Sequence, residues 1–364
     1  METLKKSDGN LTVVDSIAEA ISDTEVIFII VPTPSLESGH FSNKYVLEVI
    51  KEIGLVIKNG NKVVIDIVIT VMPGSCEGEI KSLLEACSMR KIGPDLGLCY
   101  NPEFIALGSV INDMENPDMH LIGESSNWAG ELVRLALESI VKKEVPTMKL
   151  NLTEAELVKI SVNNFVTMKI SFANILMQSA SKLKNIDIDA VTNAIGLDTR
   201  VGSKYLKAAA PYGGPCFPRD TRALSAFLND LGINSALSNA TENVNKSHLD
   251  YVINLIAETV DKESIIGIAG LSYKTGTSVT DESPGRLIAD KLVANGYKVK
   301  IWDDEGAKIQ SNLNTENLEN LDSGEQLLGQ SEFVVITRLL KSHSRFFVNL
   351  VLSNKPYLDL WRQF

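Results

Sequence analysis

The sequence predicts an α/β protein in which two regions with parallel β-sheets are separated by a helical region. Residues 26–31 follow Glu25 as an unbroken apolar run, which is typical of a parallel strand buried on both faces. Residues 264–270 open a second alternation of strand and helix. Between these runs, residues 152–183 repeat apolar side chains at steps of three and four, which predicts one long helix.

The remaining elements follow from local patterns. The first region is predicted to contain a short helix at 16–22, with Asp15 or Ser16 as its N-cap, and a second helix at 44–58. Its further strands are expected at 62–67, 97–100 and 120–123. Later elements are helices at 188–196, 239–261 and 284–295, a strand at 298–302, and a final strand and turn at 357–362. We therefore expect three domains, at 1–151, 152–249 and 250–364.

Composition excludes several classes of function. The 364 residues carry 35 Lys plus Arg against 46 Asp plus Glu, a net charge of −11, which argues against nucleic acid or an anionic membrane as a partner. No run of about 18 apolar residues occurs, and the first six residues do not form a signal peptide. The four cysteines lack CxxC spacing, so neither a metal site nor a disulfide framework is indicated. These features predict a cytoplasmic protein with reduced thiols.

The most informative stretch, residues 212–220, reads Tyr-Gly-Gly-Pro-Cys-Phe-Pro-Arg-Asp. Two glycines permit a close turn, and Cys216 stands just ahead of a helix predicted to open at Thr221. Backbone N–H groups and the helix dipole favour a thiolate there, so Cys216 is a candidate nucleophile. Asp220 could bond the chain around the sulfur or the substrate. The alternative is a small buried cysteine beside a glycine turn.

This string, with Arg200, Gly202, Tyr205 and Leu206 spaced upstream, resembles the UDP-glucose/GDP-mannose dehydrogenase family. These NAD-dependent enzymes oxidise a sugar nucleotide at C6 to a uronic acid. The resemblance covers nearly the whole chain. It implies two Rossmann-like domains, of which the N-terminal one is incomplete here, and a central helical region that forms a homodimer or higher homo-oligomer. NAD is the implied cofactor and a UDP-sugar the implied substrate.

The resemblance assigns roles in the first region. Val31, Pro32 and Thr33 correspond to the family's cofactor-facing Val-Pro-Thr-Pro string. Thr70 would contact the cofactor and help place the catalytic water, although Ile69 replaces the usual serine before it. Glu103 matches the acid/base carboxylate near the cofactor; without the resemblance it would be a solvated loop carboxylate. The sugar-binding stretch corresponds to Phe104, Ile105, Ala106 and Leu107, and Leu107 stands where many members have a second glutamate.

Roles in the other regions follow in the same way. Lys159 and Asn163 are four residues apart, on one helix face, and match the pair that stabilises the oxyanion; the alternative is a solvated surface pair. Arg200 would reach a substrate in the neighbouring subunit, and Lys274 the nucleotide diphosphate. Departures are Pro211 in a loop usually rich in glycine, and Asp281 where many members have arginine. The remaining substrate-binding residues are Tyr205, Tyr212 and Gly213.

The implied reaction is a four-electron oxidation that uses two NAD+ per sugar. Cys216 would attack the C6 aldehyde to form a thiohemiacetal, which is oxidised to a thioester. Water positioned by Glu103, Thr70 and Asp220 would hydrolyse the thioester. UDP-glucose is favoured over GDP-mannose on the cysteine loop, and UDP-N-acetylmannosamine is the less favoured alternative.

One expected feature is missing. No Gly-x-Gly-x-x-Gly precedes Glu25, and residues 1–24 are too short for the βαβ unit of about 30 residues that would carry it. An upstream start, a decaying gene copy, or a stable product unable to hold NAD would each explain this. The alternative function is therefore an inactive, truncated remnant that binds sugar nucleotide or only dimerises. Asp303 and Asp304 end a strand without a preceding glycine signature, so we do not expect them to bind a ribose.

Overall fold

The computed structural model describes residues 11–21, 23–57, 61–309, 316–340 and 343–363. Ser22 and Lys58, the last residues of two predicted helices, lie outside this set. The chain divides into two compact units, Met1–Ile160 and Ser161–Phe364. Among the described residues, no helix combines the length and apolar content needed to span a membrane.

The first unit is built on a five-stranded sheet of order β1-β2-β3-β4-β5. β1, β2 and β3 are parallel to one another, β4 runs antiparallel to β3, and β5 runs parallel to β4. The three parallel strands therefore present their carboxyl ends at one edge, where open α/β sheets bind ligands. The strands are β1 (Val26–Ile29), β2 (Val63–Ile67), β3 (Leu96–Tyr100), β4 (His120–Glu124) and β5 (Thr147–Leu150).

Helices cover both faces of this sheet. α2 (Lys44–Val56) and α3 (Lys81–Ser88) bury Ile50, Ile53 and Leu84 against one face. α5 (Asn127–Glu138) buries Ala129 and Val133 against the other face. Two short helices, α1 (Ile17–Ala20) and α4 (Val110–Glu115), and a π-helical turn, η3 (Cys76–Ile80), complete the unit.

β1 departs from its prediction. Its apolar run indicated a strand buried on both faces, but Phe28 is 43% exposed and Ile30, just after the strand, 70% exposed. The prediction of full burial is wrong because β1 is an edge strand: β2 pairs with one side, and no strand within the described residues pairs with the other. Apolar content alone does not reveal whether a neighbouring strand is present.

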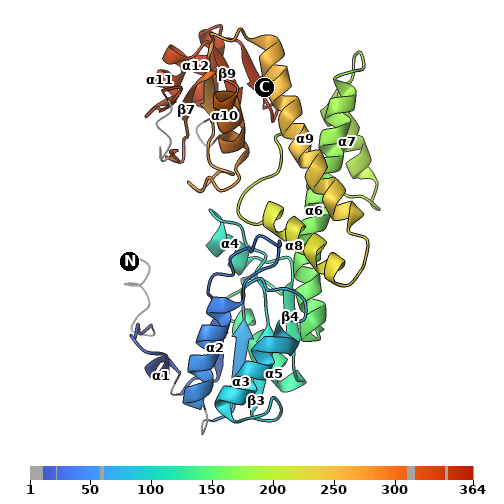
Figure 1. Ribbon diagram of the computed structural model, residues 1–364, viewed down its shortest axis with the longest axis vertical. Coiled ribbons are helices and arrows are strands. Elements are labelled where there is room, and N and C mark those ends of the chain that lie inside the picture. The colour runs from blue at the N-terminus through green and yellow to red at the C-terminus, as the bar shows by residue number, and fades with distance from the viewer. Residues whose placement is uncertain (1–10, 22, 58–60, 310–315, 341–342, 364) are drawn as a thin grey trace. The chain divides into compact units, whose positions relative to one another are not determined.

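The second unit begins with helices. α6 (Leu152–Ala180) starts in the first unit and continues into the second, ending three residues before its predicted end. It lies beside α9 (Ala236–Thr259) (Figure 1), where the Ser171 hydroxyl donates to the Thr241 carbonyl at 3.2 Å. The other helices of this part are α7 (Ile188–Leu197) and α8 (Phe217–Asp230).

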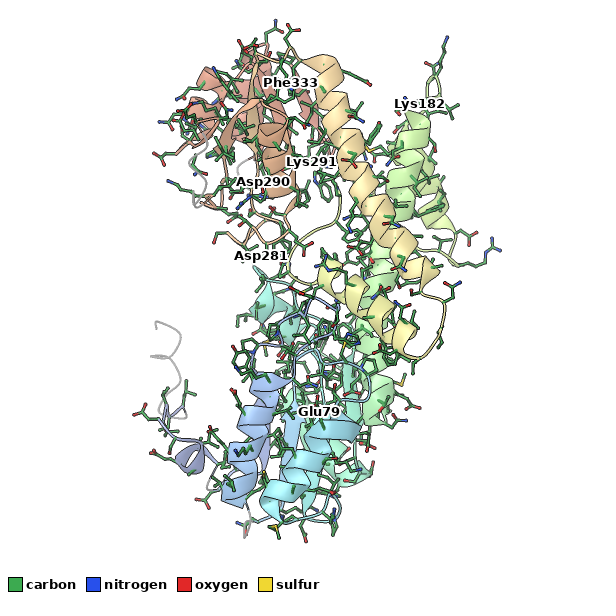
Figure 2. The ribbon with its side chains drawn as sticks, in the orientation of Figure 1. Glu79, Lys182, Asp281, Asp290, Lys291 and Phe333 are labelled. Atoms are coloured by element: carbon green, nitrogen blue, oxygen red, sulfur yellow. The ribbon has the colours of Figure 1, made fainter. Side chains whose placement is uncertain are left out.

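The second unit also contains a parallel five-stranded sheet of order β10-β9-β6-β7-β8. The chain enters at β6, adds β7 and β8 on one side, and then β9 and β10 on the other, which places a topological switch point beside β6. Phe333 is buried at the start of β9 (Figure 2). The strands are β6 (Ile265–Ala269), β7 (Lys298–Trp302), β8 (Leu318–Asn320), β9 (Phe333–Ile336) and β10 (Tyr357–Asp359); the helices are α10 (Pro284–Ala294), α11 (Gly324–Gln330) and α12 (His343–Leu352). The predicted fold class is confirmed.

Candidate functional site

In the first unit, the loops after β1 and β2 meet. Val31 is half-buried, Pro32 is exposed and Thr33 is buried. The Thr33 hydroxyl donates to the backbone carbonyl of Thr70 at 2.8 Å. Because neighbouring parallel strands end at the same edge, these two loops form one surface at the carboxyl ends of the strands.

A buried carboxylate fixes the loop that follows Thr70. Glu156 on α6 has no exposed surface, and its two oxygens accept hydrogen bonds from the backbone N–H groups of Gly74 (2.5 Å) and Cys76 (2.8 Å). Burial raises the pKa of Glu156, and its hydrogen bonds to Cys76 and Gly74 oppose this. Glu156 was not among the predicted site residues, because hydrogen bonds to backbone groups about 80 residues away leave no side-chain pattern in the sequence.

Glu103 and Lys159 lie together in the same unit. The Lys159 ammonium donates to the backbone carbonyl of Glu103 and lies 4.4 Å from the centre of the Phe104 ring. Lys159 is only 8% exposed, so the surface-lysine alternative does not describe it. Burial raises the pKa of the Glu103 carboxyl, and the charge of Lys159 lowers it in part. Ile105 and Ala106 are half-buried in the loop that follows, and Leu107 is exposed.

In the second unit, Cys216 is exposed and occupies the N-cap position of α8. The helix begins at Phe217, four residues before the predicted start at Thr221. That prediction was wrong because Pro218 was interpreted as a turn residue, whereas proline fits the first turn of a helix, where no backbone donor is needed. The earlier start places Cys216 itself at the N-terminus of the helix, where its side chain makes no capping hydrogen bond.

Asp220 is buried one turn further along α8. It is 1% exposed, and its carboxylate accepts a hydrogen bond from the Asn163 amide at 2.6 Å. The Arg219 guanidinium lies 3.4 Å from the other oxygen, and the Asn164 amide donates to the backbone carbonyl of Asp220 at 2.9 Å. Asn163 on α6 and Asp220 on α8 therefore form one polar group, one helical turn after Cys216.

The turn before Cys216 is held on one side by α9. The Asn245 side chain accepts from the backbone N–H of Tyr212 at 2.8 Å and donates to its carbonyl at 2.9 Å. Burial raises the pKa of the Tyr212 hydroxyl to about 12. Pro211 is buried, and the positive φ of this turn falls at Gly214, at 85°. The alanines before the proline are buried as well, which suits small side chains.

Four other residues named from the sequence lie at separate positions in the second unit. The Tyr205 ring lies edge-on to Phe217, with 6.3 Å between ring centres. The side chain of Arg200 is 86% exposed and pairs with Asp198 at 2.6 Å. Lys274 is half-buried in the loop after β6, and Asp281 is exposed at the end of that loop (Figure 2).

The Asp303 carboxylate forms hydrogen bonds and an ion pair with other groups of the chain. It accepts from the backbone N–H groups of Leu271 (2.6 Å) and Ser272 (2.8 Å), and pairs with Arg338 at 3.0 Å. Despite the burial, these groups hold the pKa of Asp303 below its usual value, with the Arg338 charge the largest favourable cause. An acid already bonded by its own loop is poorly placed to receive a ribose hydroxyl.

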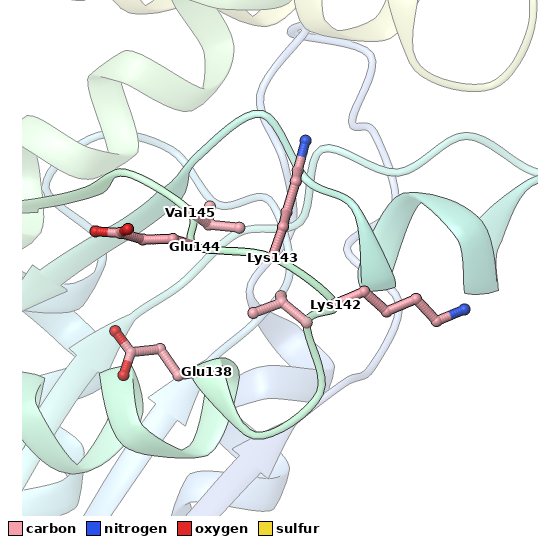
Figure 3. A pocket seen from close by; sticks show the side chains of 6 residues that line it. Glu138, Lys142, Lys143, Glu144 and Val145 are labelled. Atoms are coloured by element: carbon pink, nitrogen blue, oxygen red, sulfur yellow. The ribbon is translucent and has the colours of Figure 1, made fainter.

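A shallow hollow of about 370 Å³ lies elsewhere in the first unit (Figure 3). It is lined by Glu138 at the end of α5 and by residues 141–145. Lys142 and Lys143 extend away from Glu138 and Glu144 in this view. None of the predicted site residues lines it.

Comparison with known proteins identifies the family of the chain. Residues 1–143 match the NAD binding domain of the UDP-glucose/GDP-mannose dehydrogenase family, and residues 153–247 match its central domain. The UDP-glucose 6-dehydrogenase of Rickettsia bellii is 32% identical over 323 residues, which cover 88% of this chain and 72% of that protein. The chain belongs to the UDP-glucose/GDP-mannose dehydrogenase family.

Other members of the family give a similar result. The GDP-mannose 6-dehydrogenase of Pseudomonas putida is 31% identical over 301 residues, covering 82% of this chain and 67% of that protein. The structure of a UDP-glucose dehydrogenase from Pyrobaculum islandicum superposes with a TM-score of 0.84 at 30% identity, covering 93% of this chain and 77% of that one. The predicted family and its cofactor, NAD, are confirmed at this level.

The first unit fits part of an NAD molecule. The paired loops at Thr33 and Thr70 offer a surface at the carboxyl ends of β1 and β2, where dinucleotides bind in such folds. The sequence contains no Gly-x-Gly-x-x-Gly, the turn that seats a pyrophosphate on a helix N-terminus. Val31, Pro32, Thr33 and Thr70 can therefore contact the cofactor, whereas the described residues supply no glycine turn for its pyrophosphate.

Proposed function

We propose that this chain oxidises UDP-glucose, or a related UDP-sugar, at C6 to the uronic acid. The observation that carries this proposal is the exposed Cys216 at the N-cap of α8, followed one turn later by Asp220 bonded to Asn163. A thiol at a helix N-terminus is favoured as thiolate, which is the nucleophilic form.

The chemistry divides between the cofactor and the chain. NAD+, when bound, accepts the hydride released in each of the two oxidations. After the first oxidation, the Cys216 thiolate adds to the C6 aldehyde and a C–S bond forms, giving a thiohemiacetal. Loss of the second hydride and the hydroxyl proton leaves a thioester. Water then attacks the carbonyl carbon, the C–S bond breaks, and the acid and the Cys216 thiol are released.

The other residues have supporting roles in this proposal. Lys159 and Asn163 stabilise the oxyanion, since both offer N–H donors from the same helix. Glu103, whose pKa is raised by burial, exchanges protons with the substrate and the attacking water. Thr70 and Asp220 orient that water.

Further residues bind the sugar nucleotide in this proposal. Lys274 contacts the diphosphate, and Arg200 contacts the substrate of a neighbouring subunit, so the working form is a homodimer or higher oligomer. The proposal also divides the chain into three domains, with boundaries after residues 151 and 249. The sugar is contacted by residues 104–107, Tyr205, Tyr212 and Gly213.

A second function is supported by two observations. β1 is an edge strand within the described residues, and the sequence lacks a glycine turn for the pyrophosphate. A protein with these features could retain the sugar-nucleotide site while failing to hold NAD. In that case the chain binds UDP-sugar, or only dimerises, without catalysis.

Calorimetric titrations of the purified chain distinguish these functions. We expect binding of both NAD+ and UDP-glucose, and formation of UDP-glucuronic acid when both are present. Cys216→Ser protein should bind both ligands and form no acid. Binding of UDP-glucose without NAD+ would support the second function, and acid formation by the serine variant would exclude Cys216 as the nucleophile.

A further inference from the structure

The turn that carries Cys216 is held on its second side by the loop of residues 271–283. Backbone contact is close: the Gly214 N–H donates to the Glu282 carbonyl at 3.3 Å, and a Cβ on Gly213 would lie 2.1 Å from the same oxygen. A Cβ on Gly214 would lie 2.5 Å from the Tyr273 ring. Both glycines are therefore required by the approach of this loop, not only by the bend of the turn.

Glu282 also reaches the helix that Cys216 begins. Its carboxylate forms a two-pronged ion pair with the Arg222 guanidinium, at 2.6 and 3.2 Å. Arg222 lies on α8, six residues after Cys216, and Glu242 of α9 is 3.7 Å from it. Glu282 thus binds the turn through its backbone and α8 through its side chain.

The conformation of Glu282 is unfavourable by itself. Its φ is 45°, in the left-handed region that is sterically unfavourable for a residue with a Cβ. The next residue locks this geometry, since the buried Ser283 hydroxyl donates to the Leu271 carbonyl at 2.6 Å and accepts from the Arg286 N–H at 3.1 Å. A strained residue that is held from both sides suits a positioning function.

We propose that Glu282 and Arg222 are positioning residues for Cys216. Their ion pair holds the N-terminal turn of α8 against the 271–283 loop and so fixes the direction in which the sulfur faces. This inference rests on the proposed role of Cys216 as the nucleophile. It adds a route by which the loop that carries Lys274 can influence the reactive thiol.

The test measures alkylation of Cys216 by iodoacetamide in the absence of ligand, at neutral pH, by mass spectrometry of its peptide. We expect Glu282→Gln and Arg222→Gln each to slow alkylation by about two- to fivefold, the worth of a half-exposed ion pair. The double variant should be no slower than either single one, because both changes break the same pair.

The direction in which each variant changes the alkylation rate distinguishes a loss of positioning from an effect of charge. Removing a nearby negative charge favours a thiolate and removing a positive charge disfavours it, so charge alone predicts opposite changes in rate. Positioning predicts that both variants react more slowly. Opposite changes would overturn the proposal.

Two controls guard against general loosening of the fold. Asp290→Asn breaks the Arg286–Asp290 pair of α10, whose side chains are 32% and 47% exposed, close to the 37% and 45% of the Arg222–Glu282 pair (Figure 2). Cys87, half-buried in the first unit, is the internal reference thiol. Equal slowing by Asp290→Asn, a parallel change at Cys87, or no change at Cys216 would each overturn the inference. Because alkylation needs no substrate, failure of UDP-glucose binding would instead count against the proposed function.

Discussion

Replacing Asp66 by asparagine should change how the stability of the first unit depends on pH. Asp66 lies in the middle of β2 with no exposed surface, and neither carboxylate oxygen has a partner at hydrogen-bond geometry among the described residues. Its neighbours in register are Phe28 on β1 and Cys99 on β3. Burial raises the pKa of Asp66 to about 7, and the nearby Asn101 side chain offsets a part of this rise.

The magnitude follows from the difference between the folded and unfolded states. The unfolded value is 3.8. Between these two pKa values the folded state holds a proton that the unfolded state has lost, so stability is full below about pH 4 and falls as the pH rises to about 7. Each pKa unit corresponds to about 1.4 kcal/mol, which gives about 4 kcal/mol in total. An asparagine side chain at this position cannot ionise, so this fall should disappear in the variant.

The free energy of unfolding should be measured in urea from about pH 5 to pH 8. Pulsed deuterium labelling of the peptide that contains β2 restricts the signal to the first unit. The stability of Asp66→Asn relative to wild type should increase by about 3 kcal/mol from pH 5 to pH 8, and most of this change should occur below pH 7. Asp95→Asn, at an exposed position just before β3, is the matched control and should show no such trend. A difference between wild type and Asp66→Asn that is constant with pH would refute the reasoning, because it would mean that the buried carboxylate is ionised throughout.

Three other substitutions have defined outcomes. Cys216→Ser should abolish acid formation and leave the melting temperature unchanged, since the side chain is exposed; activity assays and calorimetry check this. Gly214→Ala should destabilise the second unit and slow alkylation of Cys216, because φ is 85° and the new Cβ would lie 2.5 Å from Tyr273. Thermal unfolding and peptide-level alkylation measure the two effects, and wild-type values in the variant would contradict the prediction. Arg338→Met should cost about 3–5 kcal/mol in urea unfolding, because it leaves the buried Asp303 carboxylate without its cation, and a loss below about 1 kcal/mol would contradict this.

Much of the fold could be predicted because its local signals are strong. The strand at 298–302 occurs at the predicted residues, and the long helix was visible from its apolar steps. The start of α8 was harder to predict, because Pro218 is compatible with both a turn and the first turn of a helix. The exposure of β1 could not be predicted from its composition, because an edge strand and a central strand can carry the same apolar residues.

The sequence was enough to propose the site residues, but it could not reveal the contacts that they make. The spacing of Lys159 and Asn163 indicated one helix face, but the sequence did not reveal that one binds the Glu103 carbonyl and the other Asp220. Glu156 was missed because its partners are backbone N–H groups about 80 residues away, which leave no side-chain pattern. The periodicity of a sequence cannot reveal hydrogen bonds between a side chain and backbone groups that are distant in the chain.

The cluster around Asp303 has an electrostatic consequence for ligand capture. Asp303 and Asp304 both pair with the guanidinium of Arg338, so this cluster at the carboxyl ends of β7 and β9 sets two carboxylates against one cation. The chain as a whole carries −11. At long range an anionic nucleotide therefore approaches against the net negative charge of the chain, and dissolved salt weakens this repulsion over about 10 Å. Association of a nucleotide diphosphate should accordingly become faster as ionic strength rises, the reverse of the steering seen in proteins that attract their anionic ligands.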